Sequence, residues 1–175
     1  YCAEQIVSGF LPTITAMQLE KVLEINIVKE ELKSEITANL PKLYSYQMGD
    51  GGFGFFAGST RSYPELTAYV TFGLLQAQEQ GYTVDKQVIE SATKYLQEKL
   101  QKTNEEEISL SSKAFILFVL AKTDYKDISS LGYLYENKEN MTLFAQIALT
   151  YYANFVDETA IRDDLLAGIE QSAVH

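Results

Sequence analysis

A chain of 175 residues can bury a sizeable apolar core, and 46% of these residues are hydrophobic, which predicts one globular domain over 1–175. The net charge is -10, so the chain as a whole would repel a phosphate backbone, and we expect no nucleic-acid partner. No apolar run of about 18 residues marks a membrane span, and no signal peptide is recognisable. Because the chain starts with Tyr1 and not Met, we expect a piece excised from a larger multidomain protein.

Eight helices are predicted, and no alternation of apolar and polar residues argues for a sheet. The second helix has apolar residues at every third or fourth position from Val28 to Leu43, and the fourth has them from Val88 to Leu100, with Asp85 placed to cap its start. The third, fifth and seventh are apolar almost all the way round, so we expect them to be buried. The predicted spans are 4–19, 25–47, 64–80, 85–102, 109–122, 127–136, 140–154 and 157–173.

From the third helix onward, buried helices alternate with amphipathic ones, which is typical of helical hairpins stacked into an inner and an outer ring. The predicted fold is therefore all-α, an α/α toroid or part of one, similar to that of terpenoid cyclases. Ala68, Ala114 and Ala145 hold comparable places at unequal spacings, which indicates a repeat of architecture without a repeat of sequence.

One glycine-rich interruption, MGDGGFGFFAGSTRS, occupies residues 48–62. Asp50, Gly51 and Gly52 form a turn signal, because glycine reaches positive φ without steric cost. The glycines alternate with phenylalanines, so we expect this loop to fold back onto the end of the ring. A phosphate-binding loop is disfavoured, since no strand precedes it and no GK[ST] ends it.

Cys2 and Gln5 are spaced i, i+3 at the start of the first predicted helix, which places both side chains on one face. Attack of the thiol on the Gln5 side-chain amide would expel ammonia and leave an internal thioester, a stored acylating group. An amine, a hydroxyl or water could then take the acyl group, so the site has to be kept dry. The aromatic residues available as a shield are Tyr1, Tyr46, Phe53, Phe55 and Phe56.

A cysteine that occurs once in a chain is also often an inert small apolar residue, and C-x-E-Q is a short pattern. The first five residues alone are therefore also compatible with a chemically unreactive Cys2. One cysteine and one histidine give no metal-ligand spacing, and we expect neither a metal nor a cofactor.

Three segments in register carry a resemblance to a known family: CAEQ at 2–5, YQMGDGGFGFF at 46–56 and ELTAYVTFGLLQAQEQGYTVD at 65–85. In order and spacing they resemble the thioester domain of the alpha-2-macroglobulin and complement superfamily, and its bacterial members most of all. The resemblance covers essentially the whole chain. It implies an α/α toroid in which Cys2 and Gln5 are the thioester partners, Glu4 is the acid of the motif, and aromatic residues with a neighbouring domain shield the bond.

The same resemblance implies a broad-spectrum protease inhibitor that acts as a covalent trap and not as a turnover enzyme. Cleavage of a bait segment by a protease exposes the thioester, which then captures an amine of that protease. Bacterial relatives are envelope proteins, so the implied location is the periplasm or cell envelope, with a lipid anchor on the parent protein and no membrane contact by this domain.

Two departures from the family pattern matter. Tyr1 stands where a glycine is frequent, and no histidine falls between Cys2 and Val174. Some complement members use a downstream histidine to favour hydroxyl acceptors, and here the acidic segment 101–109 lies where it would be expected. The thioester should therefore react directly and prefer amines, and we assign no role to the terminal His175.

Two other functions compete with this one. A terpene-cyclase-like enzyme would need an acid cluster. The adjacent Asp163 and Asp164 are more simply explained as part of a solvated helix face. Asp124 and Asp127 are explained as turn and capping residues. A non-covalent interaction scaffold would keep the fold and bind partners through the aromatic loop. The joint presence of Cys2 and Gln5 favours the thioester over the scaffold.

Overall fold

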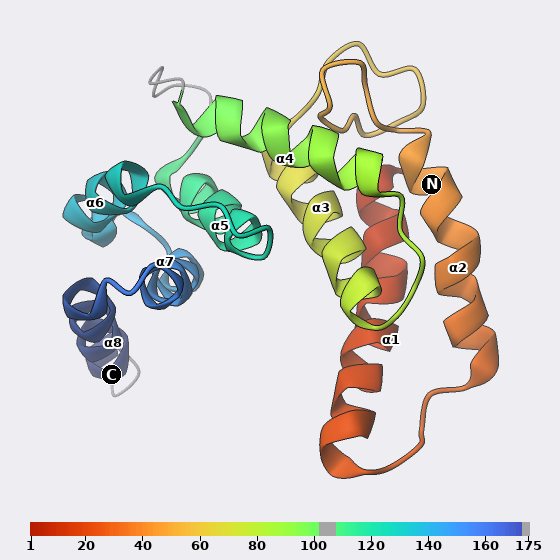
Figure 1. Ribbon diagram of the computed structural model, residues 1–175, viewed down its shortest axis with the longest axis horizontal. Coiled ribbons are helices and arrows are strands. Elements are labelled where there is room, and N and C mark those ends of the chain that lie inside the picture. Colours follow the sequence, from red (N-terminus) through yellow and green to blue (C-terminus); the bar gives the residue numbers. More distant parts are fainter. Residues whose placement is uncertain (102–107, 173–175) are drawn as a thin grey trace. The chain divides into compact units, whose positions relative to one another are not determined.

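The computed structural model describes residues 1–101 and 108–172, and the chain divides into two compact units, Tyr1–Leu96 and Gln97–His175 (Figure 1). Across the described residues the regular structure is helical, apart from one isolated antiparallel bridge between Gln47 and Phe53. The predicted all-α class is confirmed. None of the described helices combines the length and the apolar character that crossing a bilayer requires.

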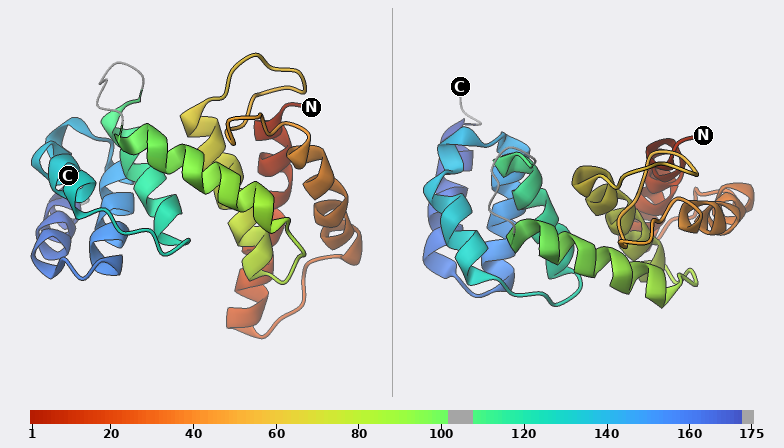
Figure 2. Two further views of the ribbon diagram at one scale, coloured as in Figure 1. Left: turned by 45° about the horizontal axis from the view of Figure 1, so that its top comes forward. Right: turned by 90° about the horizontal axis from the view of Figure 1, so that it is seen from above.

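The first unit is built from α1 (Ala3–Leu23), α2 (Glu30–Tyr44), α3 (Pro64–Glu79) and most of α4 (Lys86–Gln101). Helix α1 lies between α2 and α3 and packs against both (Figures 1 and 2). Its buried stripe of Val7, Phe10 and Ile14 follows the helical period. Gly73 lets α3 approach this stripe closely, because a Cβ at that position would lie 2.7 Å from Val7 Cγ1.

The second unit contains α5 (Leu110–Ala121), α6 (Ile128–Glu136), the short 3₁₀ helix η1 (Lys138–Asn140), α7 (Leu143–Phe155) and α8 (Thr159–Ser172). Helix α7 packs against both α5 and α8, and its Leu149 and Tyr152 are fully buried. Side-chain caps define three helix starts, because Ser109, Asp127 and Thr142 accept hydrogen bonds from main-chain N–H groups in the first turns of α5, α6 and α7.

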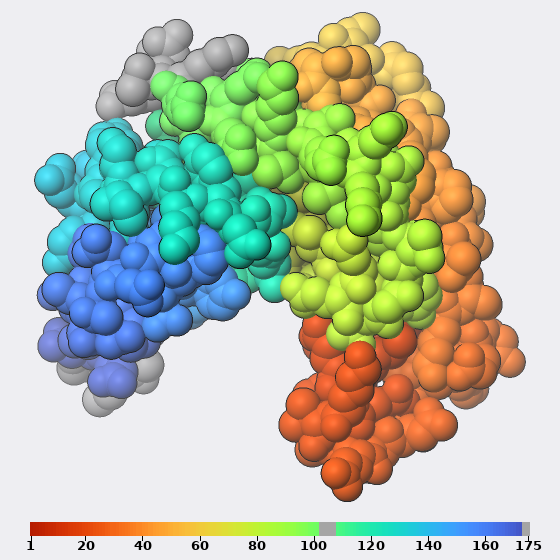
Figure 3. Space-filling model, in the orientation of Figure 1, coloured from red at the N-terminus to blue at the C-terminus, as the bar shows by residue number. Residues whose placement is uncertain are grey.

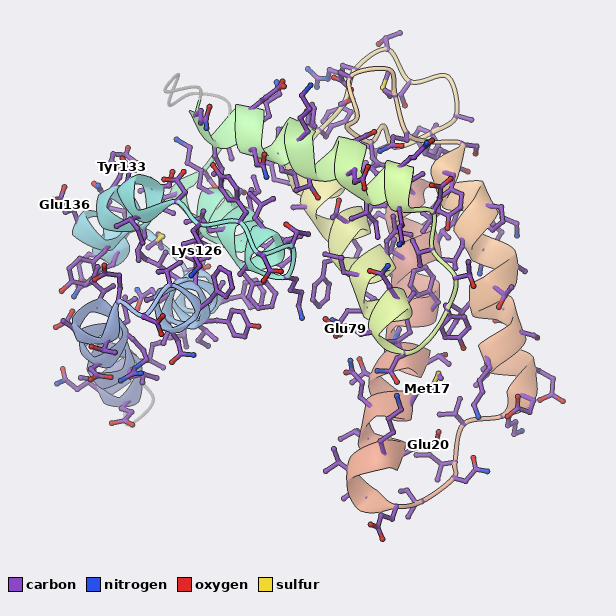
Figure 4. All side chains as sticks on the ribbon, in the orientation of Figure 1. Met17, Glu20, Glu79, Lys126, Tyr133 and Glu136 are labelled. Carbon is purple, nitrogen blue, oxygen red and sulfur yellow. The ribbon has the colours of Figure 1, made fainter. Side chains whose placement is uncertain are left out.

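Most predicted boundaries agree with the structure within a few residues, and the largest errors lie around the first connection. Helix α1 continues to Leu23, and α2 begins at Glu30 instead of 25. The carboxylate of Glu20 accepts hydrogen bonds from the N–H groups of Ile27 and Val28, which fixes this stretch as a loop (Figure 4). These bonds, that of Val28 foremost, hold the pKa of Glu20 below its usual value. The predicted ends at 102 and 173 lie outside the described residues.

The end of α1 and the loop after it lie at the surface (Figure 3). Leu19, Val22 and Leu23 are exposed there, and Leu32 of α2 is 42% exposed. One expectation about burial was wrong. Helix α7, expected to be buried all round, has one exposed face, since its packing against α5, α6 and α8 leaves that side open. The exposed residues of this face are Leu143, Phe144, Ile147 and Tyr151.

Candidate functional site

Cys2 and Gln5 interact reciprocally at the start of α1. Cys2 is the N-cap residue, and its Sγ accepts a hydrogen bond from the main-chain N–H of Gln5 at 3.4 Å. In return, Oε1 of Gln5 accepts a hydrogen bond from the N–H of Cys2 at 3.0 Å. This is the capping-box arrangement, in which two main-chain donors at the helix start are satisfied by side chains. The thiol and the carboxamide thus share the first helical turn.

The first turn of α1 presents its reactive side chains outward. Cys2 is half-buried, while Glu4 and Gln5 are exposed, and Ala3, Ile6 and their neighbours in the core fix the opposite face of the helix. Glu4 lies in the first turn, where a carboxylate interacts favourably with the helix dipole. An amine or water molecule can therefore reach this turn in the structure of the chain by itself.

The glycine-rich loop lies directly against this turn. The main-chain carbonyl of Phe55 accepts a hydrogen bond from the N–H of Ala3 at 2.9 Å. The hydroxyl of Tyr46 donates to the carbonyl of Tyr1 at 2.9 Å, and the carbonyl of Tyr46 accepts from the N–H of Gly54 at 3.1 Å. The loop therefore fixes the main chain on both sides of Cys2.

The turn of the loop is built around Asp50, Gly51 and Gly52. Gly51 has a φ of +88°, and Oδ1 of Asp50 accepts hydrogen bonds from the N–H of Gly52 at 3.0 Å and the hydroxyl of Ser62 at 2.6 Å. The turn touches α4, because a Cβ on Gly51 would lie 2.4 Å from the main-chain oxygen of Ser91. Only glycine fits this contact.

Two polar side chains that the sequence alone does not single out join the loop to α3 and α4. The hydroxyl of Thr67, at the start of α3, accepts a hydrogen bond from the N–H of Phe53 at 2.8 Å. The side-chain amide of Gln47 donates to the carbonyls of Gly51, at 3.0 Å, and of Val88 on α4, at 2.8 Å. The sequence feature that could have pointed to Thr67 is its position as a threonine within the otherwise apolar run LTAYV.

The five residues proposed as an aromatic shield occupy different environments. Tyr46 and Phe55 are half-buried beside the start of α1, and the Phe55 ring packs edge-on against Tyr63 with the ring centroids 4.8 Å apart. Phe53 is fully buried in the first unit. Tyr1 is 96% exposed and Phe56 62% exposed, so neither side chain is covered within this chain.

Three of the four acidic residues considered for an enzyme have structural partners. Asp164 pairs with Lys138 and accepts a hydrogen bond from Tyr135 at 3.0 Å, while Asp163 pairs with Arg162. Asp127 caps α6. In the part of the chain that the structure describes, no three His, Cys, Asp or Glu side chains are grouped as metal ligands. The acidic segment 102–107 lies outside the described residues.

Comparison with known proteins gives a consistent result. An A-macroglobulin TED domain model matches residues 1–173. The alpha-2-macroglobulin of Thermotoga maritima is 36% identical over 96 residues, which are 54% of this chain and 6% of that protein. Two solved structures, each 22% identical, are similar throughout. Trypsin-activated alpha-2-macroglobulin from Escherichia coli covers 96% of this chain with 12% of its own (TM-score 0.82), and Salmonella alpha-2-macroglobulin reacted with methylamine covers 95% with 12% (TM-score 0.79).

These structures confirm the predicted α/α toroid class of fold. The chain belongs to the A-macroglobulin TED domain family, the thioester domains of alpha-2-macroglobulins. It spans 6% of the length of the Thermotoga relative.

Proposed function

We propose that Cys2 and Gln5 form an internal thioester. The observation that carries this proposal is their reciprocal contact, which places the thiol and the carboxamide on one helical turn. Attack of the Cys2 sulfur on Cδ of Gln5 forms the Sγ–Cδ bond, and the amide nitrogen leaves as ammonia with the thiol proton. No cofactor or redox partner is required, because no oxidation state changes.

The thioester acts as a single-use trap for amines. A primary amine attacks Cδ of Gln5, the new C–N bond forms, and the Sγ–Cδ bond breaks to release the Cys2 thiol. Amines are better nucleophiles than unassisted hydroxyls. No histidine falls between Cys2 and Val174, so none of these residues supplies an imidazole that would favour hydroxyl acceptors. Each chain reacts once, which is the behaviour of an inhibitor and not of an enzyme.

The target we propose is an attacking protease, captured through its surface amines after it cleaves a bait segment elsewhere in the parent protein. Two similar proteins support this: one structure is of a trypsin-activated alpha-2-macroglobulin, and another is of one reacted with methylamine. The two units 1–96 and 97–175 would act together as one thioester domain, and neighbouring domains would cover the exposed first turn of α1. We place the parent protein in the periplasm or cell envelope.

The deciding experiment is an intact mass of the full-length protein, purified without amines, before and after methylamine, together with a thiol assay. The thioester predicts a starting mass lower by one ammonia, no free thiol on Cys2, and the gain of one methylamine with release of one thiol. Cys2→Ser and Gln5→Asn should abolish all three effects. Gln78→Asn, at an exposed glutamine of α3, is the matched control and should leave them intact.

The rival function is a non-covalent scaffold with an idle thiol. A specific observation favours it: the unreacted side chains already complete a capping box, so both residues have a structural use without a thioester. A titratable Cys2 and an unshifted mass in freshly prepared protein would establish the scaffold and overturn the trap.

A further inference from the structure

The second unit contains an open cavity of about 640 Å³ between the end of α4, the helix α5 and the start of α6. Its wall includes Leu100, Leu134, Tyr125, Tyr133, Lys113 and Lys126. Figure 4 labels two of them, Tyr133 on α6 and Lys126 in the connection before it. None of these residues takes part in the Cys2 site.

Lys113 is the unusual member of this wall. It is only 7% exposed, although lysine is almost never fully buried unless its charge is paired. Its Nζ lies 5.7 Å from the centre of the Tyr133 ring, within the range of a cation–π contact. Within 1–101 and 108–172, no hydrogen bond or ion pair of this Nζ is found. The ring alone supplies a weaker counterpart than a carboxylate would.

The other charges of the wall are already engaged. Asp127 accepts hydrogen bonds from the N–H of Ser130 at 2.9 Å and from the hydroxyl of Ser130 at 2.7 Å, one on each carboxylate oxygen. The Nζ of Lys126 lies over the ring of Phe155 at 5.6 Å. Among the described residues of the wall, two lysines and one aspartate leave one positive charge in excess, and the buried Lys113 has no anionic partner among them.

We propose that this cavity binds a singly charged organic carboxylate with an apolar body. The carboxylate would pair with the ammonium of Lys113 and so give this partly desolvated positive charge an anionic partner. The body would lie against Leu100, Leu134 and the Tyr125 ring, which are the apolar parts of the wall. One excess charge selects a monoanion over a dianion, and the apolar wall selects an aromatic or branched acid over acetate.

The probe we would use is 4-fluorobenzoate, observed by fluorine NMR in the presence of the 175-residue chain, with the neutral 4-fluorobenzamide as its isostere. We expect concentration-dependent broadening of the benzoate signal and at least about tenfold weaker binding of the benzamide, as expected for the loss of a charge-assisted contact. This comparison uses the unaltered chain, so it does not depend on whether any variant folds. Equal broadening of both probes, or of neither, would overturn the proposal.

Three variants test the role of the ammonium. Lys113→Met keeps the length and removes the charge, and should weaken benzoate binding about tenfold, while Lys113→Arg should retain most of it. Lys122→Met, at the end of the same helix but outside the cavity wall, is the matched control and should bind as the unaltered chain does. Circular dichroism checks that each variant is folded. Unchanged affinity in a folded Lys113→Met protein would contradict the assignment.

Discussion

The hydroxyl of Thr67 accepts a hydrogen bond from the main-chain N–H of Phe53 at 2.8 Å, and both residues are fully buried. The same hydroxyl donates to the carbonyl of Tyr63. One side chain at the start of α3 therefore satisfies a buried donor of the glycine-rich loop, which in turn contacts the start of α1.

Thr67→Val should lower the free energy of unfolding by about 1–3 kcal/mol, because it leaves the N–H of Phe53 buried without a partner. Thr71→Val is the matched control: Thr71 is equally buried on the same helix, but its hydroxyl donates only to the helical carbonyl of Thr67. Urea unfolding followed by circular dichroism gives both values. If both variants lose the same free energy of unfolding, the bond to Phe53 contributes no more to stability than the bond from Thr71 to the helical carbonyl.

Gly51→Ala should be destabilising by about 1–3 kcal/mol, since a side chain there is strained by the positive φ and collides with the main chain of α4. Gly58→Ala separates the two causes. Gly58 also has a positive φ, of +78°, but nothing lies within 4 Å of the point that a Cβ would occupy there. We expect Gly58→Ala to cost distinctly less in the same urea titration, and similar costs would mean that the contact with Ser91 contributes little.

Tyr46→Phe should accelerate hydrolysis of the proposed thioester by about two- to tenfold, the range expected for the loss of one hydrogen bond. Without the bond to the carbonyl of Tyr1, the chain before Cys2 is less restrained and water reaches the site more easily. The rate is followed as thiol release in amine-free buffer. Tyr44→Phe, which removes a hydroxyl bonded to the N–H of Asp85, should leave the rate unchanged. If both variants hydrolyse alike, Tyr46 has no protective role.

Alkaline pH should destabilise the second unit through Tyr152. Burial raises the pKa of its phenol to about 12, while the hydroxyl accepts from the N–H of Asp127 and donates to the carbonyl of Tyr125. Between pH 10 and 12 the unfolded chain loses this proton first, so the free energy of unfolding falls as pH rises, by up to about 2 kcal/mol. Below about pH 10 this contribution is fully present.

Tyr152→Phe tests the alkaline effect. The variant should be less stable at neutral pH, because the N–H of Asp127 loses its acceptor, and the difference from the unaltered chain should shrink toward pH 12. Urea unfolding at several pH values between 8 and 12 measures this difference. A difference that does not change with pH would rule out the phenol as the titrating group.

The order and type of the helices could be predicted from the sequence because apolar spacing and caps are local signals. Asp85 illustrates this, since it accepts a hydrogen bond from the N–H of Gln87 at the start of α4, as its position suggested. The loop between α1 and α2 was not predictable in the same way. Its course depends on Glu20 bonding to residues seven and eight positions further on, while Val28 still matches the apolar period of a helix.

The proximity of Cys2 and Gln5 could be predicted from the sequence, but the residues that hold the start of α1 in place could not. The spacing of Cys2 and Gln5 is a local feature, and in the structure the side chain of each residue accepts a hydrogen bond from the main-chain N–H of the other. The bonds of Thr67 and Gln47 join segments far apart in the chain, and no periodicity reveals which polar side chain will meet which main-chain group. The exposure of Phe56 likewise depends on which neighbours cover the loop.

The loop contacts the start of α1 through a main-chain bond, in which the carbonyl of Phe55 accepts from the N–H of Ala3. A second main-chain bond, from the N–H of Gly54 to the carbonyl of Tyr46, holds the loop itself. A different side chain at position 55 leaves the first bond intact, but one inserted or deleted residue presents the wrong carbonyl. The length of the segment from Gln47, which is bonded to Val88, to Tyr63, whose N–H is bonded to Phe53, is therefore more tightly restrained than the identity of most of its side chains. Tolerance of substitution and intolerance of changes in length should occur together in this segment.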